Sequence, residues 1–123
     1  MMSTAEITIG TSAGPRRIER RRNPRYPFRA EVQIVDLESG MTMSAHTSDF
    51  SRGGCYVDTF NPLPEDTVVK LRLTKWQQTL ETQAKVVYSS VGMGMGLMFG
   101  VLDASKQAIV ESWLTQLCGA QPC

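Results

Sequence analysis

Between residues 28 and 99 the chain repeatedly alternates apolar and polar side chains, and this period of two limits the possible folds more than any other feature. Residues 28–34 read FRAEVQI, which is typical of a strand with one buried face. Further segments of this kind, separated by turn-forming residues, cover residues 41–45, 55–58, 69–73, 80–88 and 93–99. Six short strands at hairpin spacing predict a six-stranded antiparallel β-barrel, closed or nearly closed.

The apolar period changes near the C-terminus. Asp103 is a suitable N-cap residue for a helix. After it, one helical face collects apolar side chains, namely Ile109, Val110, Trp113, Leu114 and Leu117, and Gly119 is expected to end the helix. The fold class is therefore all-β with one C-terminal helix, which we expect to bury its apolar stripe over one end of the barrel.

A chain of 123 residues is long enough for one domain with a real core. We expect a flexible tail at residues 1–15 and a domain at 16–118, which divides into an arm at 16–27, the barrel at 28–103 and the helix at 104–118. Three cysteines without paired spacing argue against a disulfide framework and a zinc site, so no cofactor is expected. The chain has neither a signal-peptide pattern nor a long apolar stretch, so we expect a cytoplasmic protein without membrane insertion, as a monomer or weak homodimer.

The charge of the chain is distributed unevenly. The formal net charge is only +1, yet residues 16–29 hold seven arginines against the single acid Glu19, a net charge of +6. The rest of the chain therefore sums to −5. Pro24 and Pro27 exclude a regular helix from this arm. A basic arm on a near-neutral or acidic body indicates an anionic partner, although such runs are also found as solvated tails.

The arm and the turn sequence DFSRGG (residues 49–54) carry complementary chemistry. Arginine binds phosphate and the O6/N7 edge of guanine through two parallel hydrogen bonds. Asp49 offers acceptors to the N1–H and N2–H groups of a guanine, and Ser51 can donate or accept beside it. Gly53 and Gly54 would allow positive φ and close approach of the backbone to a ligand. In the alternative interpretation this is an ordinary strand connection, in which Asp49 and Ser51 satisfy local backbone amides.

The order and spacing of these two motifs resemble the PilZ domain. Arg21 and Arg25 match the RxxxR motif of that family, and Asp49, Ser51 and Gly54 match its DxSxxG motif. The resemblance covers roughly residues 19 to 117 and includes GMGLMFGVLD, which is similar to the last strand of the family and its exit. It implies a six-stranded barrel that binds the bacterial second messenger cyclic di-GMP.

The family pattern also implies roles for individual residues. Arg21 and Arg25 would hold phosphates and guanine edges, while Asp49, Ser51 and Gly54 would receive a base. Arg20 and Arg22 flank the first motif. A cation directly before RxxxR, here Arg20, is compatible with a second, stacked ligand molecule.

The leading hypothesis is therefore a non-enzymatic receptor that orders its arm on binding cyclic di-GMP and signals through a separate, unidentified protein. One alternative is a small barrel that binds nucleic acid through the arm; the body charge of −5 and the lack of interleaved exposed aromatic residues argue against this partner. Another is a ligand-free protein-interaction module. An enzyme is the least expected class, because the sequence shows no catalytic arrangement of residues.

Overall fold

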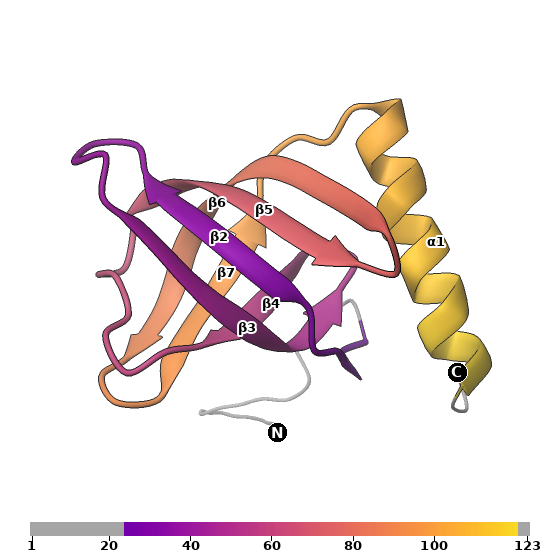
Figure 1. Ribbon diagram of the computed structural model, residues 1–123, viewed down its shortest axis with the longest axis horizontal. Coiled ribbons are helices and arrows are strands. Elements are labelled where there is room, and N and C mark those ends of the chain that lie inside the picture. Colours follow the sequence, from indigo (N-terminus) through magenta and orange to yellow (C-terminus); the bar gives the residue numbers. More distant parts are fainter. Residues whose placement is uncertain (1–23, 121–123) are drawn as a thin grey trace, which may run out of the picture.

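The structure, a computed structural model, describes residues 24–120 of the chain. It consists of a strongly curved antiparallel sheet and one helix (Figure 1). The elements are β1 (Tyr26–Pro27), β2 (Glu31–Asp36), β3 (Thr42–Ser51), β4 (Gly54–Asp58), β5 (Val68–Lys75), β6 (Gln78–Ser90), β7 (Gly94–Phe99) and α1 (Ala104–Ala120).

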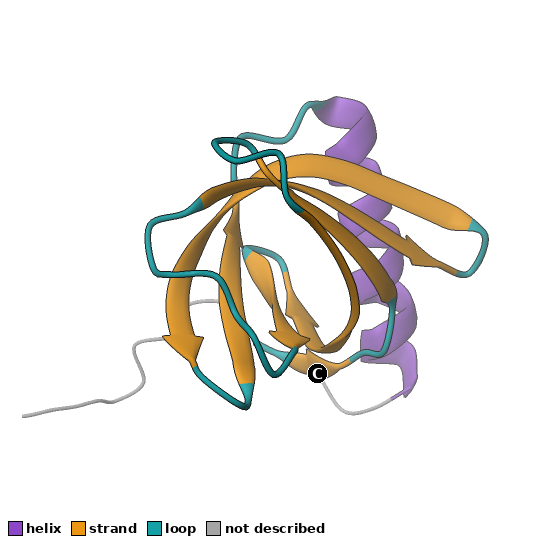
Figure 2. Cartoon of the chain, turned by 60° about the vertical axis from the view of Figure 1, so that its left-hand side comes forward, coloured by secondary structure: helices purple, strands orange, loops and turns teal. Residues whose placement is uncertain are grey.

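Six of the strands close into a barrel, as the alternating sequence predicts. The sheet order is β1-β3-β2-β5-β6-β7-β4, and an additional pairing between β3 and β4 closes the ring. Figure 2 looks into the barrel and shows the strands surrounding its interior. The two-residue strand β1 lies outside the ring and pairs only with the C-terminal end of β3. This strand is not among the six that the sequence predicts, because two residues are too few to show alternation and proline is unusual within a strand.

The inward residues of the strands form one continuous core. Aromatic rings dominate its helix end: Phe28, Phe50 and Trp113 lie with their ring centroids 5.0–5.6 Å apart. Because Trp113 is fully buried among these rings, α1 covers one end of the barrel as predicted (Figure 1). Its indole Nε1–H donates to Gln78 Oε1 at 3.0 Å, which satisfies the one polar group of the side chain.

The first predicted strand is shorter than its alternating pattern. Phe28 and Ala30 are buried as expected, but β2 begins only at Glu31. The backbone here still bonds to β3, since the Phe28 amide donates to the Ser48 carbonyl at 3.1 Å and the Thr47 amide donates to the Ala30 carbonyl at 3.0 Å. The buried hydroxyl of Thr47 adds to this pairing: it donates to the Phe28 carbonyl at 2.5 Å and accepts from the Ala30 amide at 2.9 Å. A prediction from side-chain alternation cannot detect this irregular pairing, because the burial pattern is the same as in a regular strand.

The helix begins where the sequence predicts and ends later. Asp103 Oδ1 accepts from the Lys106 amide at 2.9 Å, so Asp103 is the N-cap. Gly119 does not end the helix, which continues to Ala120. Within the described part of the chain, α1 is the one helix, and it is not apolar enough over a sufficient length to cross a membrane.

Candidate functional site

A bulge in β3 places the first residue of the DFSRGG sequence on the outside of the barrel. The strand does not break at this sequence as predicted; it runs on to Ser51, and only Arg52 and Gly53 form the turn to β4. The register of the β3–β4 pairing shifts between Thr47 and Asp49. Thr47 and Phe50 are fully buried, whereas the Asp49 side chain is 28% exposed. The extra residue therefore reverses the alternation and turns the carboxylate outward.

Strand β1 brings the end of the arginine arm beside this carboxylate. Tyr26 pairs with Phe50, and Pro27 pairs with Asp49. As a result, Arg25 Nη1 lies 3.8 Å from Asp49 Oδ2, and 47% of the arginine side chain remains exposed. The second arginine of RxxxR and the aspartate of DxSxxG thus meet on one surface, although 24 positions separate them in the sequence.

The remaining motif residues organise the turn itself. Ser51 Oγ accepts from the Gly53 amide and donates to the Gly54 carbonyl, both at 3.3 Å. This is the local hydrogen bonding that the alternative interpretation of the motif predicts for Ser51, and both hydrogen bonds are long enough to exchange for a ligand atom.

The expectation that the two motif glycines, Gly53 and Gly54, use positive φ is wrong. Positive φ among the described glycines is confined to Gly40 and Gly92, so neither Gly53 nor Gly54 adopts it. Gly54 is required for a different reason, because a Cβ atom there would overlap the Leu97 carbonyl oxygen of β7. The close approach that the structure shows is to the neighbouring strand β7.

Two tyrosines that the sequence interpretation did not include complete the outer surface beside Asp49. Asp49 pairs with Tyr56 across β3 and β4, and Tyr56 pairs with Gly96, which pairs with Tyr88. The two tyrosine ring centroids are 6.4 Å apart. A Cβ on Gly94 would lie 2.7 Å from Tyr56 Cε1, so the missing side chain in β7 allows the Tyr56 ring to lie against the sheet.

Tyr88 faces outward because of a second bulge. Its alternation with Val86 predicts a core residue, but the β6–β7 register shifts between these two positions, and Tyr88 is 53% exposed. The predicted lack of exposed aromatic residues on the strands is therefore wrong. The alternate glycines of GMGMG were the available signal, since small residues on one face of a strand leave room for rings from neighbouring strands.

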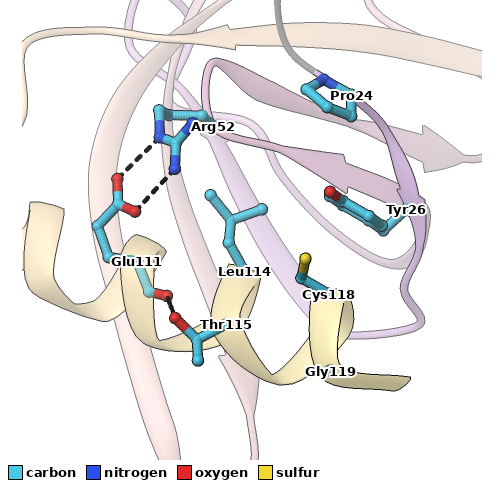
Figure 3. Close-up of a pocket in the computed structure, with 8 residues that line it drawn as sticks. All are labelled: Pro24, Tyr26, Arg52, Glu111, Leu114, Thr115, Cys118 and Gly119. Atoms are coloured by element: carbon cyan, nitrogen blue, oxygen red, sulfur yellow. Dashed lines mark hydrogen bonds and ion pairs between the residues drawn. The ribbon is translucent and has the colours of Figure 1, made fainter. Parts of the chain in front are cut away.

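The turn residue Arg52 ties this surface to α1. Its guanidinium Nε and Nη2 each donate to one oxygen of the Glu111 carboxylate at 2.8 Å (Figure 3). Gln107 Nε2 also donates to Glu111, at 2.9 Å. These donors lower the pKa of Glu111 to about 2, with the hydrogen bonds from Arg52 as the largest cause. The pair lies at a cavity of about 380 Å³, lined by Pro24, Tyr26, Arg52, Glu111, Leu114, Thr115, Cys118 and Gly119.

Three further predictions concern the remaining arginines, a metal site and the cysteines. Arg20, Arg21 and Arg22 are outside the described residues. No group of His, Cys, Asp or Glu side chains within residues 24–120 could hold a metal ion. Cys55 is free and buried, and its burial raises the pKa of its thiol.

Comparison with known proteins agrees with this architecture. The family model of the PilZ domain matches residues 19–116, which is most of the chain. The chain belongs to the PilZ family. Its barrel, with the DxSxxG sequence at the β3–β4 turn and Arg25 beside it, is the six-stranded PilZ fold with one C-terminal helix. Comparison with curated proteins finds no match.

Solved PilZ structures share the fold at low sequence identity. The PilZ domain of CeSA from a cellulose-synthesizing bacterium is 21% identical, with a TM-score of 0.63 over 76% of this chain and 97% of that one. The PilZ domain of Escherichia coli YcgR, solved with c-di-GMP, is 15% identical, with a TM-score of 0.69 over 83% and 94% of the two chains. K. pneumonia MrkH, also in complex with c-di-GMP, is 21% identical, with a TM-score of 0.68 over 84% of this chain and 54% of its own.

Proposed function

We propose that this PilZ protein is a receptor for cyclic di-GMP, which it binds on the outer surface formed by Arg25, Asp49, Ser51 and Tyr56. The observation that carries the proposal is the meeting of Arg25 and Asp49 at 3.8 Å on an exposed face. The structures of YcgR and MrkH with c-di-GMP support the choice of ligand.

The chemistry of a guanine nucleotide suits this pair. At 3.8 Å the ion pair is too long for a good hydrogen bond, so each partner keeps capacity for another group. A phosphate or the O6/N7 edge of guanine would accept from Arg25, and the N1–H and N2–H groups would donate to Asp49. Both partners therefore gain hydrogen bonds when the ligand separates them, and neither is left unpaired.

The aromatic surface adds a second contribution. A guanine directed toward Asp49 from the β4 side would lie over the Tyr56 ring, which is held against the sheet. Stacking on an aromatic side chain contributes about 1–3 kcal/mol per base in nucleic-acid complexes. We therefore add Tyr56 to the binding residues, with Tyr88 as its neighbour.

In this proposal the arginine arm closes over the bound ligand. Arg20, Arg21 and Arg22 precede Arg25 by three to five residues, so they would reach the phosphates of a ligand anchored at Asp49. The ordered arm and the ligand together would form the surface that a separate partner protein reads. Arg20 would contact a second, stacked ligand molecule if two are bound.

Calorimetry tests the proposal directly. The chain is titrated with cyclic di-GMP at moderate salt, with GMP and a DNA oligonucleotide as controls. We expect saturable binding in the micromolar range or tighter that is selective over both controls, and the molar ratio distinguishes one ligand from two. Absence of heat with the dinucleotide would contradict the receptor function.

The second candidate is a module that binds nucleic acid. The sequence argued against it because it predicted no exposed aromatic residues on the strands, but Tyr88 is exposed beside Tyr56. Aromatic rings beside a basic arm can stack successive bases of a single strand. Salt-sensitive DNA binding without preference for the cyclic dinucleotide would support this candidate instead.

A further inference from the structure

Arg52 lies between two candidate ligand residues in the chain but is directed toward the helix. Its neighbours Ser51 and Gly53 form the turn of the DFSRGG sequence. Its guanidinium, however, reaches across to Glu111 of α1, where both of its bonds to the carboxylate are 2.8 Å long (Figure 3). One short turn therefore carries both the proposed ligand site and the attachment of the helix.

The Arg52–Glu111 ion pair has good hydrogen-bond geometry, but other anions can reach it from solvent. The side chains of Arg52 and Glu111 are 50% and 44% exposed, so an anion in solution can approach the guanidinium. A planar guanidinium binds phosphate as well as it binds carboxylate, with the same two-pronged geometry. The Nε and Nη2 groups of Arg52, which donate to Glu111, cannot bind the carboxylate and a phosphate at the same time.

The cavity beside the ion pair makes its loss tolerable for the fold. Tyr26 and Pro24 line one side of this space, and Leu114 and Thr115 of α1 line another (Figure 3). Since a pocket of about 380 Å³ lies beside the pair, the two side chains are not enclosed in a packed interface there. The core contacts of α1, made by Trp113, remain in place.

We propose that Arg52 is a further ligand-binding residue, which Glu111 withholds until a phosphate of the bound dinucleotide competes for its guanidinium. The inference rests on the proposed function, since the phosphate comes from a ligand anchored at Asp49 and Ser51. Transfer of Arg52 to the ligand releases Glu111, so binding loosens the attachment of α1. By linkage, weakening this attachment must also tighten ligand binding.

The variant Glu111→Gln tests this competition, because it removes the charge that holds Arg52. Calorimetry at fixed moderate salt should show cyclic di-GMP binding up to about fivefold tighter than in the unmodified chain, the range of an exposed ion pair. Glu81→Gln is the matched control: it removes the carboxylate of another half-exposed ion pair, Arg72 Nε to Glu81 Oε2 at 3.3 Å, away from the β3–β4 turn. Its affinity should equal that of the unmodified chain.

Hydrogen exchange supplies a measurement on the helix. Cyclic di-GMP should speed amide exchange around residues 107–115 of α1 in the unmodified chain. In Arg52→Gln, exchange there should already be faster without ligand, ligand should cause no further increase, and binding should be about tenfold weaker.

The outcomes separate this inference from the proposed function. If the unmodified chain binds no cyclic di-GMP, both fail. If it binds, but Glu111→Gln and Glu81→Gln have equal affinities, or if Arg52→Gln binds normally, the receptor function stands and the role of Arg52 is refuted.

Discussion

Two ion pairs flank the β3–β4 turn, and they differ in geometry far more than in exposure. Arg25 and Asp49 make one contact of 3.8 Å. Arg52 and Glu111 make two hydrogen bonds of 2.8 Å, and Gln107 adds a third donor to the same carboxylate. All four charged side chains are between 28% and 50% exposed.

The difference shows which carboxylate is available to a ligand. Glu111 has its acceptor positions occupied by three short hydrogen bonds, whereas Asp49 shares only one loose contact. A ligand that donates hydrogen bonds should therefore bind at Asp49, and an anionic ligand should compete for an arginine. The accessible surface alone would not distinguish the two pairs.

The largest effect should follow from removing the geometry on which both pairs depend. Gly54→Ala places a methyl group on the Leu97 carbonyl oxygen, so β4 must move away from β7. We expect unfolding in urea to show a loss of about 3 kcal/mol.

Gly119→Ala is the control for Gly54→Ala, since an added Cβ there meets nothing within 4 Å and alanine favours helix. It should be neutral or stabilising by less than about 1 kcal/mol. Equal stabilities of the two variants would contradict the close β4–β7 approach.

Removing the loose pair should affect binding and spare the fold. Arg25→Ala should weaken cyclic di-GMP binding at least tenfold, because a hydrogen bond to a charged group contributes about 1.5–3 kcal/mol. Asp49→Asn should weaken it by a similar order and relax the preference for guanine. Both variants should unfold within about 0.5 kcal/mol of the unmodified chain, as is usual for exposed substitutions. Calorimetry measures the binding and urea unfolding measures the stability. If both are lost together, these residues have a structural role and do not bind the ligand directly.

The aromatic neighbour of the loose pair should have a smaller effect. Tyr56→Ala should weaken ligand binding by roughly 1 to 2 kcal/mol, about tenfold, while Tyr56→Phe should bind nearly as well as the unmodified chain because the ring surface remains. Weak binding by both variants would instead assign the effect to the hydroxyl group, and normal binding by Tyr56→Ala would remove the ring from the site. Calorimetry again gives the measurement.

The most local effect should appear in the titration of the tight pair. NMR of the Glu111 carboxyl group should give a midpoint near pH 2, well below its usual value of 4.5, and Arg52→Ala should return it toward 4.5. Because the folded-state pKa is lowered, the stabilisation is fully present above about pH 4.5 and is lost as the pH falls through 2. A midpoint in the unmodified chain near 4.5 would show that the pair does not persist in solution.

The barrel could be predicted from the sequence because alternation reports burial directly. Residues 69–73 and 80–86 alternate without interruption, and β5 and β6 follow them closely. The start of the helix was equally predictable, because Asp103 is a good N-cap residue and an apolar stripe with helical spacing follows it in the sequence.

The candidate site was only partly predictable, because it depends on two bulges. The motif residues Arg25, Asp49 and Ser51 were identified from their types and spacing. The outward turn of Asp49 and Tyr88, however, comes from one extra residue in each strand, at Ser48 and Val87, and ordinary residues stand at both positions. The Arg52–Glu111 pair joins positions 59 residues apart, so no local pattern could reveal it.

The closure of the barrel by β3 and β4 also removes the open sheet edges on which fibrils of many proteins grow. A sheet that ends in unpaired strands offers a template for strands of another copy, whereas a ring gives each of its strands two partners. Among the described strands only β1 lies outside the ring; it is two residues long, and its Pro27 has no amide hydrogen to donate. Exposed apolar residues such as Phe60 and Val91 can therefore remain at the surface without a neighbouring free edge on which amyloid-like stacking could begin.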